Sequence, residues 1–162
     1  MKRKQMTKNP NIKLVIFDGY GVAFSRGYPD TMKVLAKRLK RDEKELQDVF
    51  YHKYFNLAAE RKVTQKQAWI RPIKELGLDI DWREVRALHY KLFTRNYKVL
   101  AIVNKVQEET TTLMLSKNTR SQFYDTGQKL EFKKYFKNII NTYELNLPKA
   151  SRKTMKLIMK RF

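Results

Sequence analysis

The hydrophobic and polar positions of this chain first form a short, unbroken apolar run. Residues 14–17 are large or β-branched, and the run ends at Asp18, with Gly19 and Gly21 close behind. A continuous apolar run bounded by glycines is typical of a strand buried on both faces, as in a parallel sheet. Ligands of such sheets gather beyond the carboxyl ends of the strands, which is where Asp18 stands.

Helical periodicity takes over after this strand. It predicts helices at residues 30–40, 42–59, 64–76 and 81–94, the third with Pro72 inside it as a kink. Each of the last three begins at a residue pattern that forms an N-terminal capping box. The pairs are Asp42 with Glu45, Thr64 with Gln67, and Asp81 with Glu84.

Strands and helices alternate in the rest of the chain. The pattern predicts a helix at 97–107, a strand at 111–116, a helix from about 119 to 130, a strand at 138–142 and a basic helix from about 150. Alternation of this kind argues for an α/β fold with a Rossmann-like parallel sheet. We expect a core of residues 1–24 plus 96–162, interrupted by an all-α insertion at residues 25–95.

Three residues with useful chemistry close the predicted strands or follow them. They are Asp18, Ser116 and Lys149, and parallel strands would bring them to one edge of the sheet. A carboxylate can attack an electrophilic centre and form a covalent intermediate, a hydroxyl can hold an oxygen of the transferred group, and a lysine can neutralise charge. Each residue alone has an ordinary structural explanation, so the prediction depends on the set.

The set resembles the haloacid dehalogenase-like (HAD) hydrolase superfamily from Ile12 onward. The segment VIFDGYGVAF is similar to the first motif of that family, with Asp18 as the nucleophile and Gly21 in its usual place. Tyr20 stands where the phosphatases of the family carry a second Asp as general acid and base. The 2-haloacid dehalogenase branch has a tyrosine there, so the resemblance leaves a phosphate ester or a 2-haloacid as the small anionic substrate.

The other motifs of the family are also recognisable. Ser116 fits the second motif, with Lys117 in the usual Asn place and Asn118 one position late. Glu144 and Lys149 have the spacing of the third. The helical insertion is similar in position and length to the helical cap of the family, which implies that it closes over the site. Besides the catalytic set, the resemblance favours substrate contacts from Tyr20, Gly21 and Asn118. Arg26 stands at the entry to the insertion, where its charge suits an anionic group of the substrate, and solvation is its simpler explanation.

The resemblance weakens at the carboxyl end. The family continues into a strand with acidic residues that complete a Mg²⁺ site, but no Asp or Glu follows Glu144 here. We therefore expect a C-terminally incomplete core in which Asp18 alone would be a metal ligand, with weak or absent Mg²⁺ binding. The first strand would also be an open edge, covered by a second copy, by a partner chain or by the last helix.

Charge adds a second hypothesis. The chain has 36 Lys and Arg against 16 Asp and Glu, a net charge of +20, and both ends are basic segments without acids. A non-catalytic HAD-fold module that binds an anionic partner such as nucleic acid through these ends is the alternative function. A solvated basic surface is the simpler explanation.

Composition limits the chemistry and the cellular location that we expect for the protein. The chain has no cysteine, which excludes disulfides and thiolate chemistry, and neither an apolar run of spanning length nor a secretory signal is visible. We expect a cytoplasmic protein without a membrane partner. His52 and His89 lack metal-ligand spacing, and we expect them at the surface or partly buried.

Overall fold

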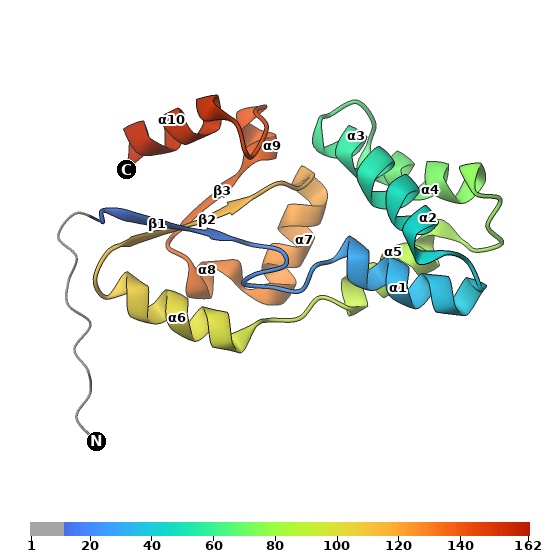
Figure 1. Ribbon diagram of the computed structural model, residues 1–162, viewed down its shortest axis with the longest axis horizontal. Coiled ribbons are helices and arrows are strands. Elements are labelled where there is room, and N and C mark those ends of the chain that lie inside the picture. The colour runs from blue at the N-terminus through green and yellow to red at the C-terminus, as the bar shows by residue number, and fades with distance from the viewer. Residues whose placement is uncertain (1–11) are drawn as a thin grey trace, which may run out of the picture.

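A computed structural model describes residues 12–162 of the chain. Its sheet has three parallel strands, β1 (Leu14–Asp18), β2 (Thr111–Ser116) and β3 (Asn138–Asn141), in the order β1–β2–β3 (Figure 1). The predicted parallel α/β architecture is confirmed. Because β2 is paired on both sides, its apolar run is buried almost throughout, and the carboxyl ends of all three strands point the same way.

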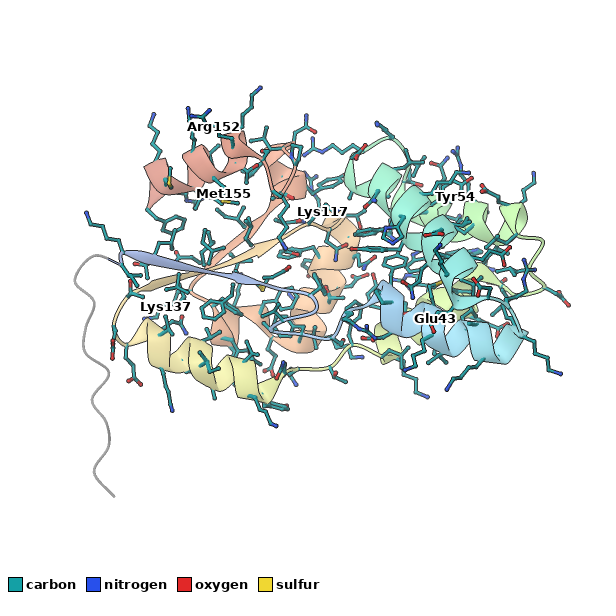
Figure 2. All side chains as sticks on the ribbon, viewed as in Figure 1. Glu43, Tyr54, Lys117, Lys137, Arg152 and Met155 are labelled. Atoms are coloured by element: carbon teal, nitrogen blue, oxygen red, sulfur yellow. The ribbon has the colours of Figure 1, made fainter. Side chains whose placement is uncertain are left out.

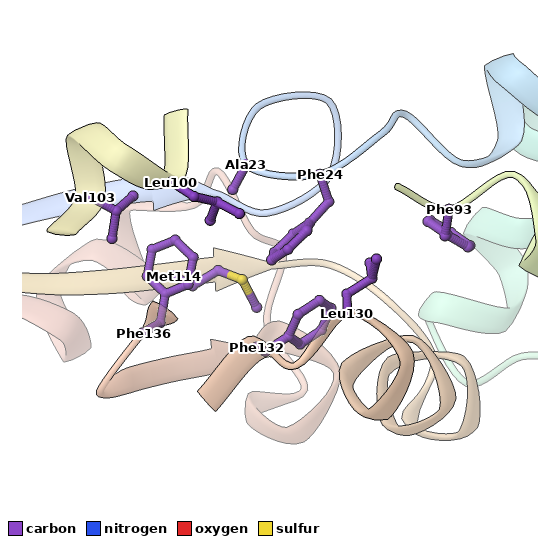
Figure 3. Close-up of a cluster of buried hydrophobic side chains, with 9 residues drawn as sticks. All are labelled: Ala23, Phe24, Phe93, Leu100, Val103, Met114, Leu130, Phe132 and Phe136. Atoms are coloured by element: carbon purple, nitrogen blue, oxygen red, sulfur yellow. The ribbon is translucent and has the colours of Figure 1, made fainter. Parts of the chain in front are cut away.

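Helices cover both faces of the sheet. The first face is covered by α6 (Tyr97–Gln107), α7 (Arg120–Leu130) and α8 (Phe132–Tyr135), and the second by α9 (Thr142–Leu145) and α10 (Arg152–Arg161). Met114 points into the first face and Leu113 into the second, as the alternation of side chains along a strand requires. Figure 3 shows Met114 among the apolar side chains that close the first core.

The remaining helices form what we call the helical unit. It consists of α1 (Tyr28–Leu39), α2 (Glu43–Gln47), the π-helix η1 (Asp48–Phe55), α3 (Asn56–Ala59), α4 (Gln65–Glu75) and α5 (Trp82–Lys91). These elements gather on one side of the sheet, beyond the carboxyl ends of its strands (Figure 1). They share a core of their own around Leu35, Phe50 and Trp69, which explains the apolar positions at helical spacing.

Several predicted helices differ in detail. The helix expected at 42–59 is helical throughout, but eight residues in its middle wind as the π-helix η1. The capping box of Thr64 and Gln67 is present in both directions. Asp81 instead caps the backbone N–H of Arg83. The carboxylate of Glu84 does not complete the box but forms an ion pair with Arg38 at 2.7 Å. The last strand ends at Asn141, and Thr142 begins the short helix α9.

Strand β1 is an edge of the sheet. Within residues 12–162 it pairs with β2 alone, and Ile16 remains 40% exposed. Helix α10 packs on a face of the sheet through Ile158.

The structure describes one of the two basic ends of the chain in full. The exposed basic side chains of α10 belong to the carboxyl end. The basic residues near the amino terminus lie outside the described residues, namely Lys2, Arg3, Lys4 and Lys8. Among residues 12–162, no helix has the length and apolarity that crossing a membrane requires.

His89 joins the helical unit to the sheet half of the molecule. It is fully buried, contrary to the sequence prediction, because the rings of Tyr28 and Trp69 pack against it at 4.5 and 5.0 Å. Thr31 Oγ1 donates to the carbonyl of Gly27, so it accepts from Nδ1–H of His89 at 2.9 Å. Nε2 then accepts from the amide of Gln122 in α7, also at 2.9 Å. The imidazole is thus neutral and fixed at both nitrogens.

This burial predicts an acid-sensitive fold. Desolvation lowers the pKa of His89 to about 3, below its ordinary 6.5, so its stabilising contribution is complete above pH 6.5 and is lost as the pH falls toward 3. Between about pH 7 and about pH 5, the free energy of unfolding should fall by about 2 kcal/mol more in the wild type than in His89→Gln. Urea unfolding at both pH values measures this difference. The exposed His52→Gln variant is the matched control, and an equal pH dependence in all three proteins would contradict the assignment.

Candidate active site

The site begins where β1 ends. Asp18 is the last residue of β1 and is paired in register with Leu115, and its side chain is 45% exposed. The chain then turns back sharply, with the N–H of Phe24 donating to the carbonyl of Gly19 at 2.9 Å. Gly21 has a φ of 87°, in the left-handed region that favours glycine, which explains its place in this turn. The turn leaves the carboxylate of Asp18 at the carboxyl edge of the sheet.

Lys149 comes to this carboxylate from the far end of the chain. Its Nζ lies 2.5 Å from Oδ1 of Asp18, across 131 positions of sequence. The loop that carries it is fixed by the start of α10: the N–H of Ser151 and the hydroxyl of Thr154 both donate to the carbonyl of Pro148, at 3.2 and 2.7 Å. Asp18 and Lys149, two of the three predicted catalytic residues, are therefore brought together.

A cavity of about 630 Å³ opens beside this ion pair. The sheet half supplies Asp18, Tyr20, Lys117, Thr142 and the loop 146–150 to its walls, and the helical unit supplies Tyr51 and Ala59, with Glu60 just after α3. The cavity thus lies between the two halves of the molecule, at the edge of the sheet where the sequence predicts ligands.

Tyr20 borders the cavity but its hydroxyl is committed elsewhere. Its ring packs edge-on against Phe93 at 5.5 Å, and its hydroxyl is hydrogen-bonded to Oγ1 of Thr126. Thr126 donates its own proton to the carbonyl of Gln122, so the phenol is the donor in this bond. Burial raises the pKa of Tyr20 to about 12. The phenol therefore stays protonated near neutral pH and is not placed for acid–base work in the cavity.

Ser116 and Asn118 lie deeper at the same edge. Ser116 is fully buried, and its hydroxyl has no hydrogen-bond partner within the described part of the chain. Asn118 holds the strand ends together, since its N–H donates to Oδ1 of Asn141 and its carbonyl accepts from Nδ2 of Asn141, both at 3.0 Å. Its own Oδ1 accepts from the N–H of Thr119 at 2.9 Å. Neither Ser116 nor Asn118 is among the residues that line the cavity.

Gly21 and Arg26 lie apart from the ion pair. Both line a second cavity, of about 390 Å³, that does not include Asp18 or Lys149. The guanidinium of Arg26 is held by Asp30, since its Nε and Nη2 donate to Oδ1 at 2.9 and 2.7 Å. Gly21 lies in the turn that follows Asp18, and neither Gly21 nor Arg26 lines the cavity beside the ion pair.

Two side chains that line the cavity beside the ion pair were not predicted as site residues. Tyr51 comes from the π-helix η1, and burial together with the nearby carboxylate of Asp18 raises its pKa. Lys117 follows β2, and burial together with nearby Lys149 lowers its pKa. Figure 2 places Lys117 between the sheet half and the helical unit. In the sequence, Lys117 stands at the usual Asn place of the second motif, and Tyr51 lies within the helix predicted at 42–59.

The donors around the cavity do not fit Mg²⁺. Its two carboxylates, Asp18 and Glu60, are each held by an ammonium group, from Lys149 at 2.5 Å and from Lys62 at 2.8 Å. Magnesium requires near-octahedral oxygen ligands and favours carboxylates that are free to bind it. Within residues 12–162, no group of three or more His, Asp or Glu side chains is gathered closely enough to hold a metal ion.

The architecture is shared with solved structures. Neither a family model nor a curated protein sequence matches this chain. A HAD-family enzyme of Bacteroides thetaiotaomicron superposes with a TM-score of 0.67 at 14% identity, over 92% of this chain and 77% of that one. An L-2-haloacid dehalogenase of Xanthobacter autotrophicus with chloropropionic acid covalently bound gives 0.65 at 14%, over 93% and 65%.

This chain has the HAD-like fold. The putative HAD-hydrolase YfnB of Bacillus subtilis, bound to magnesium, is a further neighbour, with a TM-score of 0.61 at 10% identity over 93% of this chain and 74% of that one. The Bacteroides enzyme is also known in complex with magnesium and inorganic phosphate. Identities of 10–14% carry the HAD-like fold alone, and this chain spans about two thirds to three quarters of the length of these neighbours.

The exposure of the ion pair predicts that it matters little for stability in this HAD-like fold. The side chains of Asp18 and Lys149 are 45% and 27% exposed, and partly exposed pairs typically contribute about 1 kcal/mol or less. Asp18→Asn should therefore keep its free energy of unfolding within about 1 kcal/mol of the wild-type value in urea titrations. A loss of about 3 kcal/mol or more would show that the carboxylate is needed to hold the strand ends together.

Proposed function

We propose that this chain is a HAD-like hydrolase in which Asp18 is the nucleophile. The observation that carries the proposal is the contact between Asp18 and Lys149 at the wall of a cavity that lies between the sheet half and the helical unit. The ammonium group engages Oδ1, and within residues 12–162 no hydrogen bond engages Oδ2. A carboxylate oriented through one oxygen, with the other directed to bound substrate, is arranged for nucleophilic attack.

The proposed substrate is a small 2-haloacid. Oδ2 of Asp18 would bond to the carbon that carries the halogen while the carbon–halogen bond breaks and halide leaves with the electron pair. Water would then attack the carbonyl carbon of the resulting aspartyl ester, giving a 2-hydroxy acid, a proton and the regenerated carboxylate. Lys149 would hold Oδ1 throughout and stabilise negative charge on the carboxylate when the ester is cleaved.

Two features favour this substrate over a phosphate ester. Tyr20 occupies the position where the resemblance implies a catalytic Asp in phosphatases, and its phenol donates to Thr126 instead of facing the cavity. The donors around the cavity also do not fit the Mg²⁺ that phosphoryl transfer in such enzymes would use. Ser116 is fully buried and does not line the cavity, so the proposal gives it no contact with the substrate.

Halide release from 2-chloropropionate and 2-bromopropionate tests the proposal, with p-nitrophenyl phosphate as the competing substrate. Turnover of the haloacids should persist in EDTA and fall by at least about 1000-fold in Asp18→Asn, because the nucleophile is lost. Lys149→Met should lose about 100-fold, the size expected for one group that stabilises the transition state.

Asp30→Asn is the matched control, because Asp30 pairs with Arg26 at the separate cavity and its loss should leave turnover unchanged. Haloacid turnover that survives in Asp18→Asn would refute the nucleophile. Phosphate release that depends on Mg²⁺, without any halide release, would replace the haloacid with a phosphate ester.

A further inference from the structure

Lys117 places a second cation in the cavity of Asp18. It follows the last residue of β2, is half-buried, and lines the cavity between the sheet half and the helical unit (Figure 2). The first cation, Lys149, is neutralised by Asp18. The charge of Lys117 requires a separate explanation.

The partners of Lys117 carry no charge. Its Nζ donates to Oδ1 of Asn56 at 2.9 Å and lies 6.0 Å from the centre of the Phe55 ring. Within residues 12–162 it takes part in no ion pair. Glu60 lines the same cavity, but its carboxylate lies 2.8 Å from Nζ of Lys62. The charge of Glu60 therefore acts on Lys117 without a direct contact, and the ammonium itself touches only an amide and a ring. Such a half-buried ammonium is only partly compensated, because burial weakens its hydration.

We propose that Lys117 is the receptor for an anionic group of the substrate, a carboxylate or a phosphate. The amide oxygen of Asn56 would yield to an anionic oxygen, which is the stronger acceptor for an ammonium donor. A molecule held in this way occupies the same cavity as Asp18 and presents its remaining atoms to the nucleophile. This inference rests on the proposed function for the reaction, but anion binding itself requires no turnover.

Calorimetric titration with propionate and with inorganic phosphate tests this inference and distinguishes the two kinds of anion. Lys117→Met should weaken the preferred anion by about tenfold or more, since a charge-assisted hydrogen bond is lost while the packing on Phe55 is kept. Lys117→Arg should restore most of the affinity. Lys153→Met removes an exposed lysine of α10 and is the control of equal charge, with an expected change of less than about twofold.

Asp18→Asn separates the two proposals. It removes the nucleophile and a negative charge from the cavity, so anion binding should be kept or tightened while turnover is lost. If Lys117→Met does not fold, NMR of the wild-type chain with ¹³C-dimethylated lysines gives the same answer, because the Lys117 signal should shift on titration with the anion. The inference is overturned if the wild type binds neither anion, if Lys117→Met binds as tightly as Lys153→Met, or if the Lys117 signal does not move.

Discussion

The parallel pairing of three strands, with β2 in the centre, is the constraint on which the rest of the structure depends. It points all three carboxyl ends the same way, so that Asp18 at the end of β1, Lys117 after β2 and the loop of Lys149 beyond β3 meet at one edge. The apolar side chains of β2 alternate between two cores and keep its register fixed. Without this pairing, the fold would not bring Asp18 and Lys149 together across 131 positions of sequence.

Charge and hydrogen bonding then decide what chemistry this edge can support. Asp18 faces the cavity with Lys149 on one of its oxygens. Lys117 lines the same cavity and donates to the neutral side chain of Asn56. The other carboxylate of the cavity, Glu60, is held by Lys62. Such a set fits an anionic substrate and a carboxylate nucleophile better than it fits a divalent cation. Tyr20 supports the same view, since its proton is directed at Thr126 and away from the cavity.

Sequence periodicity predicted the fold well and the site in part. The apolar runs of β1 and β2 and the alternation with helices indicated the parallel sheet, and strand-end logic led to Asp18 and Lys149. The sequence does not predict Tyr51 as a site residue, because the π-winding of η1 changes which side chains face the cavity. No residue type in that segment indicates π-winding. Arg26 is close to Asp18 in sequence, but the intervening turn carries it to Asp30. The importance of Lys117 depends on what surrounds it, which spacing alone does not reveal.

The central claim is that Asp18 becomes covalently attached to the substrate and is then released by attack of water on its own carbonyl carbon. A single turnover of 2-chloropropionate in ¹⁸O-labelled water, with excess enzyme and mass spectrometry of the peptide that contains Asp18, tests this claim most directly. The account predicts that one labelled oxygen enters the side chain of Asp18 and that the 2-hydroxy acid carries an unlabelled oxygen. Label found in the product alone, with Asp18 unlabelled, would show that water attacks the substrate directly and would contradict the account.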